Sequence, residues 1–183
     1  MRFALIVLLL IGSISPVVHA QEMSTSAAGL AVARVHTIDY SLVYPGILPN
    51  NPLYPIKMIR DRIVLFLIAD PVKRASFNLL QADKRVAAGE LLLKEDEKNE
   101  ALAITTIEKG ENYFHEAFNQ AFQLKREGRE VNIFIQKLSS AREKHTQVLT
   151  DLKKAVTYEN GKKLEVLLNR LKTYQKPLQD AQK

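Results

Sequence analysis

Three polar residues in the middle of the chain have a spacing that would let a helix aim them at one ion. Glu108, Glu111 and His115 are separated by three and then four positions, so an α-helix places them on one face. Carboxylate and imidazole groups bind metals, but a closed site needs partners from another helix, and the sequence offers no specific ones. We interpret the three residues as a polar helix face and expect no metal site.

The sequence lacks the motifs of common enzyme classes. It has no G-x-S-x-G nucleophile elbow, no H-E-x-x-H zinc motif, no E-x-x-H pair of a di-metal bundle and no glycine cluster for a phosphate. It has no cysteine either, which excludes a disulfide framework, a thiol nucleophile and a thiolate zinc site. We therefore expect a protein that is not an enzyme, with no catalytic residues and no cofactor.

His145 stands out because it interrupts an otherwise apolar stripe. The other positions of that stripe follow a spacing of three and four residues: Val131, Phe134, Leu138, Ala141, Val148, Leu152 and Ala155. A histidine there could set helix register, bind a ligand or sense pH, or it could be a core-edge residue with one hydrogen bond. Burial alone favours the neutral imidazole, so the stripe predicts a lowered pKa and a neutral or stabilising effect of His145→Leu.

The first twenty residues have the plan of a secretory signal peptide. Arg2 supplies a positive charge, an apolar run extends over 3–14, and small residues precede a cleavage site between Ala20 and Gln21. The alternative is an uncleaved anchor, because the apolar segment is close to the minimum length for a bilayer span. Either way we expect an exported protein that is secreted, periplasmic or at the cell surface.

The remaining chain predicts an all-α fold. Residues 21–43 form a flexible or extended tether, and a stiff segment with four prolines follows over 44–55. Asp70 and Pro71 form a strong helix start, Gly128 a helix end, and Asn160-Gly161 a turn. The sustained three-four spacing is typical of coiled-coil-like packing, and short links make successive helices antiparallel. We expect one domain over 44–183, an elongated antiparallel bundle of about five helices, beginning at Pro52 or Pro55.

Positive charge gathers in the last third of the chain. Residues 127–183 contain seven acidic and twelve basic residues, a net charge of +5, whereas residues 21–126 are balanced. The candidate contact surface consists of Lys153, Lys154, Lys162, Lys163, Arg170, Lys172 and Lys176. Such a surface suits anionic lipid headgroups or wall polymers, although a solvated helix face is the simpler interpretation. Nucleic acid is not expected, because no reading motif accompanies the charge.

The proline segment and the helix starts after it resemble those of a bacterial family of exported domains of unknown function. The resemblance rests on a Pro-Gly-x-Leu-Pro-x-x-Pro-Leu-Tyr-Pro-x-Lys motif and the later Asp-Pro start, here Pro45, Gly46, Leu48, Pro49, Pro52, Leu53, Tyr54, Pro55, Lys57, Asp70 and Pro71. Two P-x-x-P spacings within it could bind an aromatic groove, but a rigid packed turn anchored by Tyr44 and Tyr54 is the better interpretation. The resemblance implies export and a helical fold, and it implies no activity.

These observations favour an exported, non-enzymatic helical module that contacts a protein or another component of the cell envelope. Binding of anionic envelope components through the basic C-terminal third is the alternative, and an enzyme is the third and least favoured class. Contact with a membrane is expected only through an uncleaved signal segment or weak electrostatic attraction.

Signal-peptide cleavage can be tested directly on exported protein. Its N-terminal sequence should begin at Gln21, because signal peptidase accepts the small residues that precede this bond. N-terminal sequencing or intact mass measurement would show this, and an exported form that retains Met1 would identify residues 3–20 as an anchor.

Overall fold

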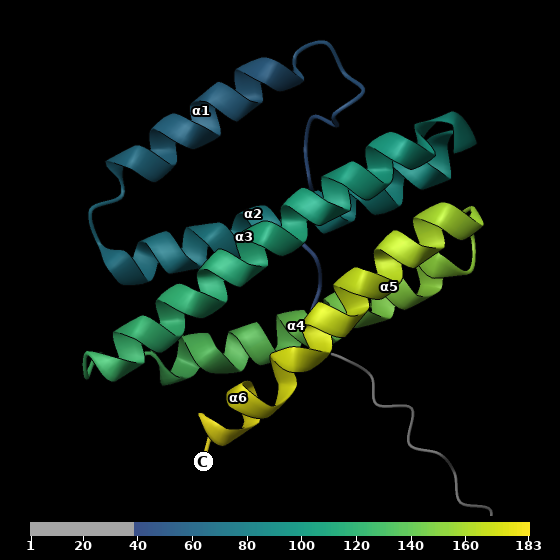
Figure 1. The fold of residues 1–183 in the computed structure, drawn as a ribbon. Coiled ribbons are helices and arrows are strands. Elements are labelled where there is room, and N and C mark those ends of the chain that lie inside the picture. Colours follow the sequence, from purple (N-terminus) through teal and green to yellow (C-terminus); the bar gives the residue numbers. More distant parts are fainter. Residues whose placement is uncertain (1–38) are drawn as a thin grey trace, which may run out of the picture. The chain divides into compact units, whose positions relative to one another are not determined.

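The structure is a computed structural model that describes residues 39–183, and every regular element among them is helical. The elements are α1 (Tyr54–Leu67), α2 (Pro71–Glu95), the one-turn 3₁₀ helix η1 (Glu97–Asn99), α3 (Glu100–Arg126), α4 (Asn132–Lys153), α5 (Tyr158–Thr173) and α6 (Gln175–Asp180) (Figure 1). This confirms the predicted all-α fold. The predicted signal peptide, with its cleavage site at Ala20 and Gln21, lies outside the described residues.

Local sequence signals explain most helix ends. The Asp70 carboxylate accepts a hydrogen bond of 2.8 Å from the Lys73 backbone N–H, and Pro71 occupies the first turn, so α2 begins as predicted. Gly128 follows α3 with a φ of +75°, a left-handed conformation that glycine adopts without steric cost. Of the two predicted starts of the first helix, the structure has the later one, with Pro55 in the first turn of α1.

Two local expectations are wrong. Asn160 and Gly161 lie inside α5 rather than in a turn, because the chain already enters this helix at Tyr158. Ala155 does not continue the α4 stripe: α4 ends at Lys153, and Ala155 is exposed.

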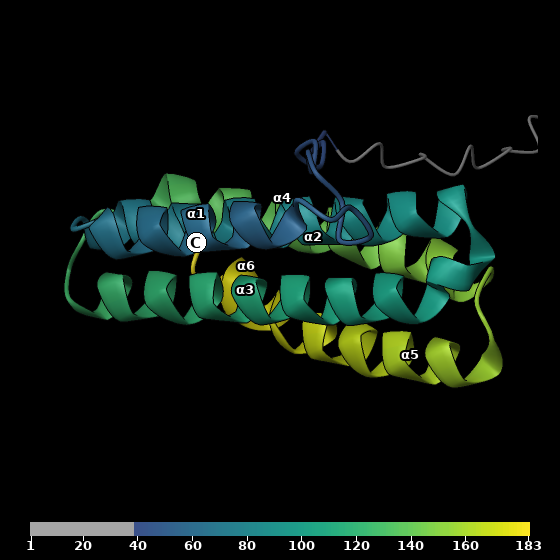
Figure 2. The same ribbon diagram turned by 90° about the horizontal axis from the view of Figure 1, so that it is seen from above.

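Successive helices from α2 to α5 run in opposite directions, as the short links require. The closest backbone approach joins α2 to α3, which lie side by side, and α4 packs mainly on α5 (Figures 1 and 2). By contrast, α1 makes no comparable approach to any other described helix. Helix α1 is therefore attached to the bundle much less tightly than the other long helices.

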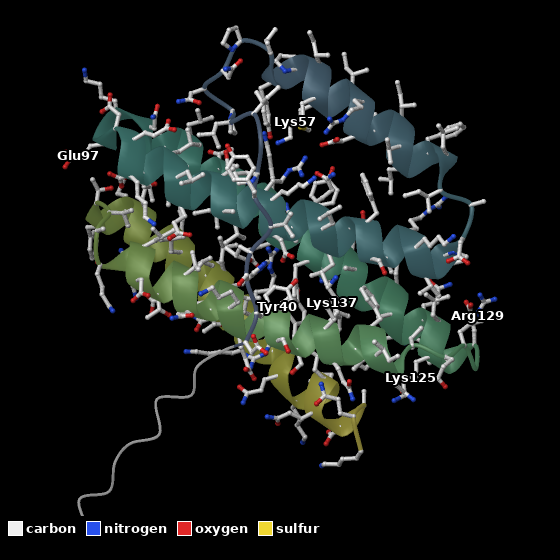
Figure 3. All side chains as sticks on the ribbon, turned by 180° about the vertical axis from the view of Figure 1, so that it is seen from behind. Tyr40, Lys57, Glu97, Lys125, Arg129 and Lys137 are labelled. Carbon is white, nitrogen blue, oxygen red and sulfur yellow. The ribbon has the colours of Figure 1, made fainter. Side chains whose placement is uncertain are left out.

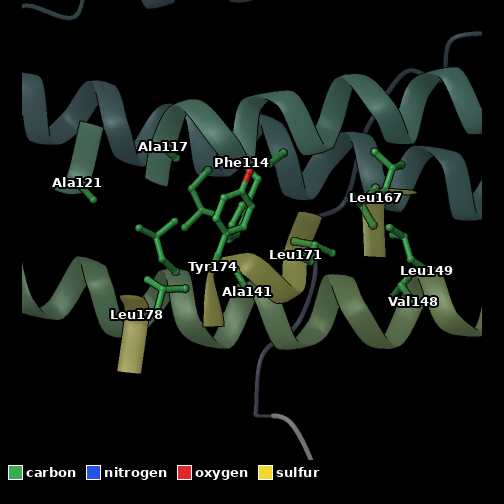
Figure 4. Packing of buried hydrophobic residues seen from close by; sticks show 14 of the residues in the cluster. Phe114, Ala117, Ala121, Ala141, Val148, Leu149, Leu167, Leu171, Tyr174 and Leu178 are labelled. Atoms are coloured by element: carbon green, nitrogen blue, oxygen red, sulfur yellow. The ribbon is translucent and has the colours of Figure 1, made fainter. Parts of the chain in front are cut away.

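The core is formed by the apolar stripes of α2 to α6. Its fully buried members include Leu79, Ile107, Phe114, Leu138 and Leu171, and burying each such side chain stabilises the fold by about 2 kcal/mol. The Phe114 and Tyr174 rings lie near the centre of the cluster, with centroids 5.6 Å apart (Figure 4).

Small residues let α2 and α3 approach closely. A methyl group placed on Gly89 of α2 would lie 2.8 Å from Ile107 Cδ1 and 2.9 Å from the Ala103 carbonyl oxygen, both on α3. Gly161 of α5 is buried as well, but a methyl group there would lie no closer than 3.9 Å to its neighbours.

These two glycines offer a matched test of the α2–α3 packing. Gly89→Ala should lower the free energy of unfolding by about 1–3 kcal/mol, because the added methyl overpacks the interface. Gly161→Ala should leave stability unchanged or raise it by up to about 1 kcal/mol, because alanine favours helix and space is available. Urea unfolding monitored by circular dichroism measures both, and equal effects would contradict the close approach.

Candidate functional site

The three residues singled out on α3 do not converge on one point. Glu111 is fully buried and faces α4, whereas the partly exposed His115 lies against Tyr174, with 2.9 Å between Nδ1 and the phenol oxygen. Glu108 is half-buried and joins neither group. Within residues 39–183, no group of three or more histidine, aspartate or glutamate side chains has a geometry that could hold a metal ion.

Glu111 instead belongs to a buried cluster with His145 and Asp83. His145 Nδ1 lies 2.9 Å from Glu111 Oε1, and Nε2 lies 3.0 Å from Asp83 Oδ1. The three side chains come from α2, α3 and α4, and none is more than 2% exposed. One imidazole therefore joins three helices through both of its ring nitrogens.

Tyr40 extends this cluster to the segment before α1. Its hydroxyl donates a hydrogen bond of 2.6 Å to Asp83 Oδ2, so both oxygens of that carboxylate have a partner. Burial, together with this hydrogen bond and the negative charge of Asp83, raises the pKa of Tyr40 well above its usual range. The phenol thus stays protonated and holds the segment against α2, and Figure 3 shows Tyr40 beside the bundle.

The electrostatics of His145 differ from the sequence expectation. Burial does favour the neutral imidazole, but the charge of Glu111, the hydrogen bonds to both carboxylates and the charge of Asp83 together outweigh it and raise the pKa of His145 to about 9. We therefore expect an imidazolium at neutral pH, which donates from both nitrogens. The stripe correctly predicts burial, yet the predicted lowering of the pKa is wrong, because the two carboxylates come from other helices.

The same geometry overturns the expectation for His145→Leu. A leucine would leave Asp83 and Glu111 buried without a cation, and removing one partner from a buried ion pair typically costs about 3–5 kcal/mol. Glu111 Oε2 already lacks a hydrogen-bond partner among the described residues, so the cluster has little capacity to absorb a further loss. The cluster holds three helices together through its hydrogen bonds. Because solvent does not reach it, it is not placed to act on a substrate.

Sequence reasoning identified His145 but missed Asp83 and Glu111 as its partners. The only local signal is that each acid directly follows a small seam residue, Ala82 and Gly110 respectively. This position puts a carboxylate at the edge of an interface, but it does not say which residue it meets.

The basic C-terminal surface is partly neutralised within the chain. Lys153 pairs with Glu165 at 3.2 Å, and Lys154 pairs with Asp151 at 2.9 Å. Lys162 lies 4.5 Å from the centre of the Tyr158 ring. Arg170 is half-buried and donates to Asn112, whereas Lys163, Lys172 and Lys176 are exposed on α5 and α6.

The proline segment is fixed to α1 by a lysine. Lys57 Nζ donates hydrogen bonds to the carbonyl oxygens of Pro45, at 2.6 Å, and Ile47, at 3.0 Å, and it lies over the Tyr54 ring. Of the two tyrosines expected to anchor this turn, Tyr54 is half-buried at the start of α1, whereas Tyr44 is 78% exposed and does not anchor it.

Helix α1 carries its largest apolar side chains on the face that points away from the bundle. Its outward positions are 53–84% exposed: Ile56, Ile59, Ile63, Phe66 and Leu67. The inward positions are more polar, with Lys57 bound to carbonyl groups and Asp61 buried. Among the described residues, no helix combines the length and the apolar character needed to cross a bilayer.

Comparison with known proteins gives a family and no assigned activity. The family model described as Domain of unknown function (DUF5667) matches residues 46–171, which is more than half of the chain. The match begins at Gly46 in the proline segment and ends at Leu171 in α5. No curated protein and no solved structure gives a significant match.

The raised pKa of His145 predicts a specific pH dependence of stability. The charged ring contributes fully below its ordinary pKa of 6.5, and the contribution is lost as pH rises through about 9. The free energy of unfolding should therefore fall between about pH 6.5 and pH 9.5, by up to about 3 kcal/mol. Urea titrations across this range measure it.

A second histidine supplies the control. His115→Gln removes an imidazole outside the cluster and should keep the decline with pH, whereas His145→Gln should be less stable and lack it. Stability of the unmodified chain that rises over the same range would contradict the charged cluster.

Proposed function

The chain belongs to the DUF5667 family, and from this premise and its geometry we propose that it is an exported, non-enzymatic module that docks on an anionic membrane surface through α1. The observation that supports the proposal is the outward apolar stripe of α1, formed by Ile56, Ile59, Ile63, Phe66 and Leu67. Contiguous exposed apolar surface of this kind is typical of interaction sites.

Positive charges flank this stripe on both sides. At about 100° per residue, Arg60 and Arg62 lie on opposite edges of the stripe, and both are exposed. The only acidic residue of α1, Asp61, is buried and pairs with Arg60 at 2.7 Å, so Arg62 carries the uncompensated charge of this face. An apolar face edged by arginines is the pattern of a helix that lies in the membrane interface, with cationic heads reaching the lipid headgroups.

The same charges disfavour a second copy of the chain as the partner. A symmetric dimer through the stripe would bring Arg60 and Arg62 of one copy near those of the other, and the single acidic residue of α1, Asp61, is already paired with Arg60 at 2.7 Å. An anionic bilayer surface offers the opposite charge and accepts the apolar side chains, so it fits the stripe better.

The basic C-terminal third remains a second candidate contact. Lys163, Lys172 and Lys176 are exposed and could reach the same anionic surface. Attraction through these residues alone is electrostatic, so about 0.5 M salt should abolish it. Binding that persists at this salt would argue against the C-terminal surface as the sole contact.

Vesicle binding tests the proposal. The chain should co-sediment with phosphatidylcholine vesicles that contain phosphatidylglycerol, and more weakly with phosphatidylcholine alone, because each basic residue near an anionic surface adds about 1 kcal/mol. The double variant Ile59→Ser, Phe66→Ser should lower the partition coefficient at least tenfold, since a buried large apolar side chain contributes about 1.5–3 kcal/mol.

Ile133→Ser provides the matched control, because Ile133 is 84% exposed but lies on α4. This variant should bind vesicles like the unmodified chain. Equal loss in both variants, or a stable dimer by light scattering that the Ile59 and Phe66 changes dissolve, would contradict membrane docking by α1.

A further inference from the structure

A groove separates the inner face of α1 from α2 and α3. Its volume is about 600 Å³, within the range of small-molecule sites, and most of its lining is apolar. The apolar walls come from Met58 and Leu65 of α1, Phe77 of α2 and Tyr113 of α3, and Ile59 and Ile63 of the outer stripe border the groove at its edge. A groove of this volume with apolar walls can accommodate an alkyl chain.

A buried arginine lies in this groove without a carboxylate partner. Arg85 of α2 is 4% exposed, and no acidic side chain of the described residues comes within 4.0 Å of its guanidinium. The guanidinium instead lies 4.3 Å from the centre of the Tyr113 ring. Burying a cation without a counterion is costly, so the position favours an anion from outside the chain.

One edge of this guanidinium lacks a strong hydrogen-bond acceptor. Nη1 is occupied by the backbone and side-chain oxygens of Gln81, at 3.3 and 2.6 Å. Nη2 contacts only the Met58 sulfur, a weak acceptor at 3.4 Å, and Nε has no partner among the described residues. Nε and Nη2 together form the edge that grips a carboxylate through two parallel hydrogen bonds.

The charges around the groove leave a positive excess. Its charged lining consists of Asp61, Arg62 and Arg85, a net charge of +1. Asp61 is itself held by Arg60, with 2.7 Å between Oδ1 and Nη2, so its charge is largely compensated outside the groove.

We propose that this groove binds a single-chain carboxylate amphiphile, with the carboxylate on the Nε–Nη2 edge of Arg85 and the alkyl chain along Ile63, Leu65 and Phe77. The carboxylate would displace the Met58 thioether from Arg85 Nη2, and this costs little because the methionine is flexible and its contact is weak. The groove borders the outer stripe of α1 at Ile59, Arg62 and Ile63, so laurate binding is measured without vesicles to separate it from membrane docking.

Laurate is a suitable probe, used below its micellar concentration in solution without vesicles. Isothermal titration calorimetry should show one site per chain for laurate and at least tenfold weaker binding of dodecanol and dodecylamine, which share the alkyl chain but lack the carboxylate. Equal binding of laurate and dodecanol would overturn the proposal, as would no binding of laurate, and both measurements use the unmodified chain.

Variants then locate the site. Arg85→Gln should weaken laurate binding at least tenfold, because the carboxylate loses its cation. Arg142→Gln is the matched control: Arg142 is also a buried arginine but does not line the groove, so laurate affinity should not change. A folded Arg85→Gln variant that binds laurate normally would overturn the assignment. If that variant unfolds, the comparison of laurate with dodecanol on the unmodified chain tests whether the groove recognises the carboxylate.

Discussion

The buried contacts of His145 with two carboxylates constrain how the bundle can be assembled. His145 meets Asp83 and Glu111 through opposite ring nitrogens, so α2, α3 and α4 must be in register for both contacts to form. The two acids are 62 and 34 positions away in the sequence, which makes the cluster a long-range constraint on the fold. Because buried carboxylates are costly without a cation, competing arrangements of the same helices are disfavoured.

The cluster lies in the solvent-excluded interior, so a binding partner can reach only other parts of the molecule. Its ionisable groups are buried against Phe114, whose ring centroid lies 5.5 Å from that of His145, and they have no access to a substrate. The features that suit a partner lie instead on and behind α1: an apolar stripe outside and a groove with Arg85 inside. A bundle fixed by α2, α3 and α4 can hold this loosely attached helix in place while leaving both of its faces available.

Local rules predicted the helices well, because their signals lie within a few residues of one another. Asp70, Pro71 and Gly128 mark helix ends through capping and backbone geometry, and the stripe around His145 predicted its burial. The same rules wrongly predicted a turn at Asn160-Gly161, because glycine is also tolerated in the first turn of α5. The charge of His145 was not predictable in this way, because it depends on carboxylates from two other helices.

The sequence could not predict which face of α1 points to solvent, because this too depends on contacts with other segments. The sequence does not show that the apolar stripe of Ile56, Ile59 and Ile63 points to solvent. That outcome depends on Lys57 and Asp61 being engaged on the inner side, Lys57 with the carbonyl oxygens of Pro45 and Ile47. Arg85 likewise becomes informative only when its neighbours are known, because an arginine in an amphipathic helix is otherwise unremarkable.

The most direct measurement of the central claim is the protonation state of the His145 ring in the folded protein. Nitrogen-15 NMR of the imidazole, assigned by comparison with His145→Gln, distinguishes a ring with two N–H groups from either neutral tautomer. The account predicts that both nitrogens carry protons at pH 7.5 and that the signal changes only near pH 9. A neutral ring at pH 7.5, with one bare nitrogen, would contradict it.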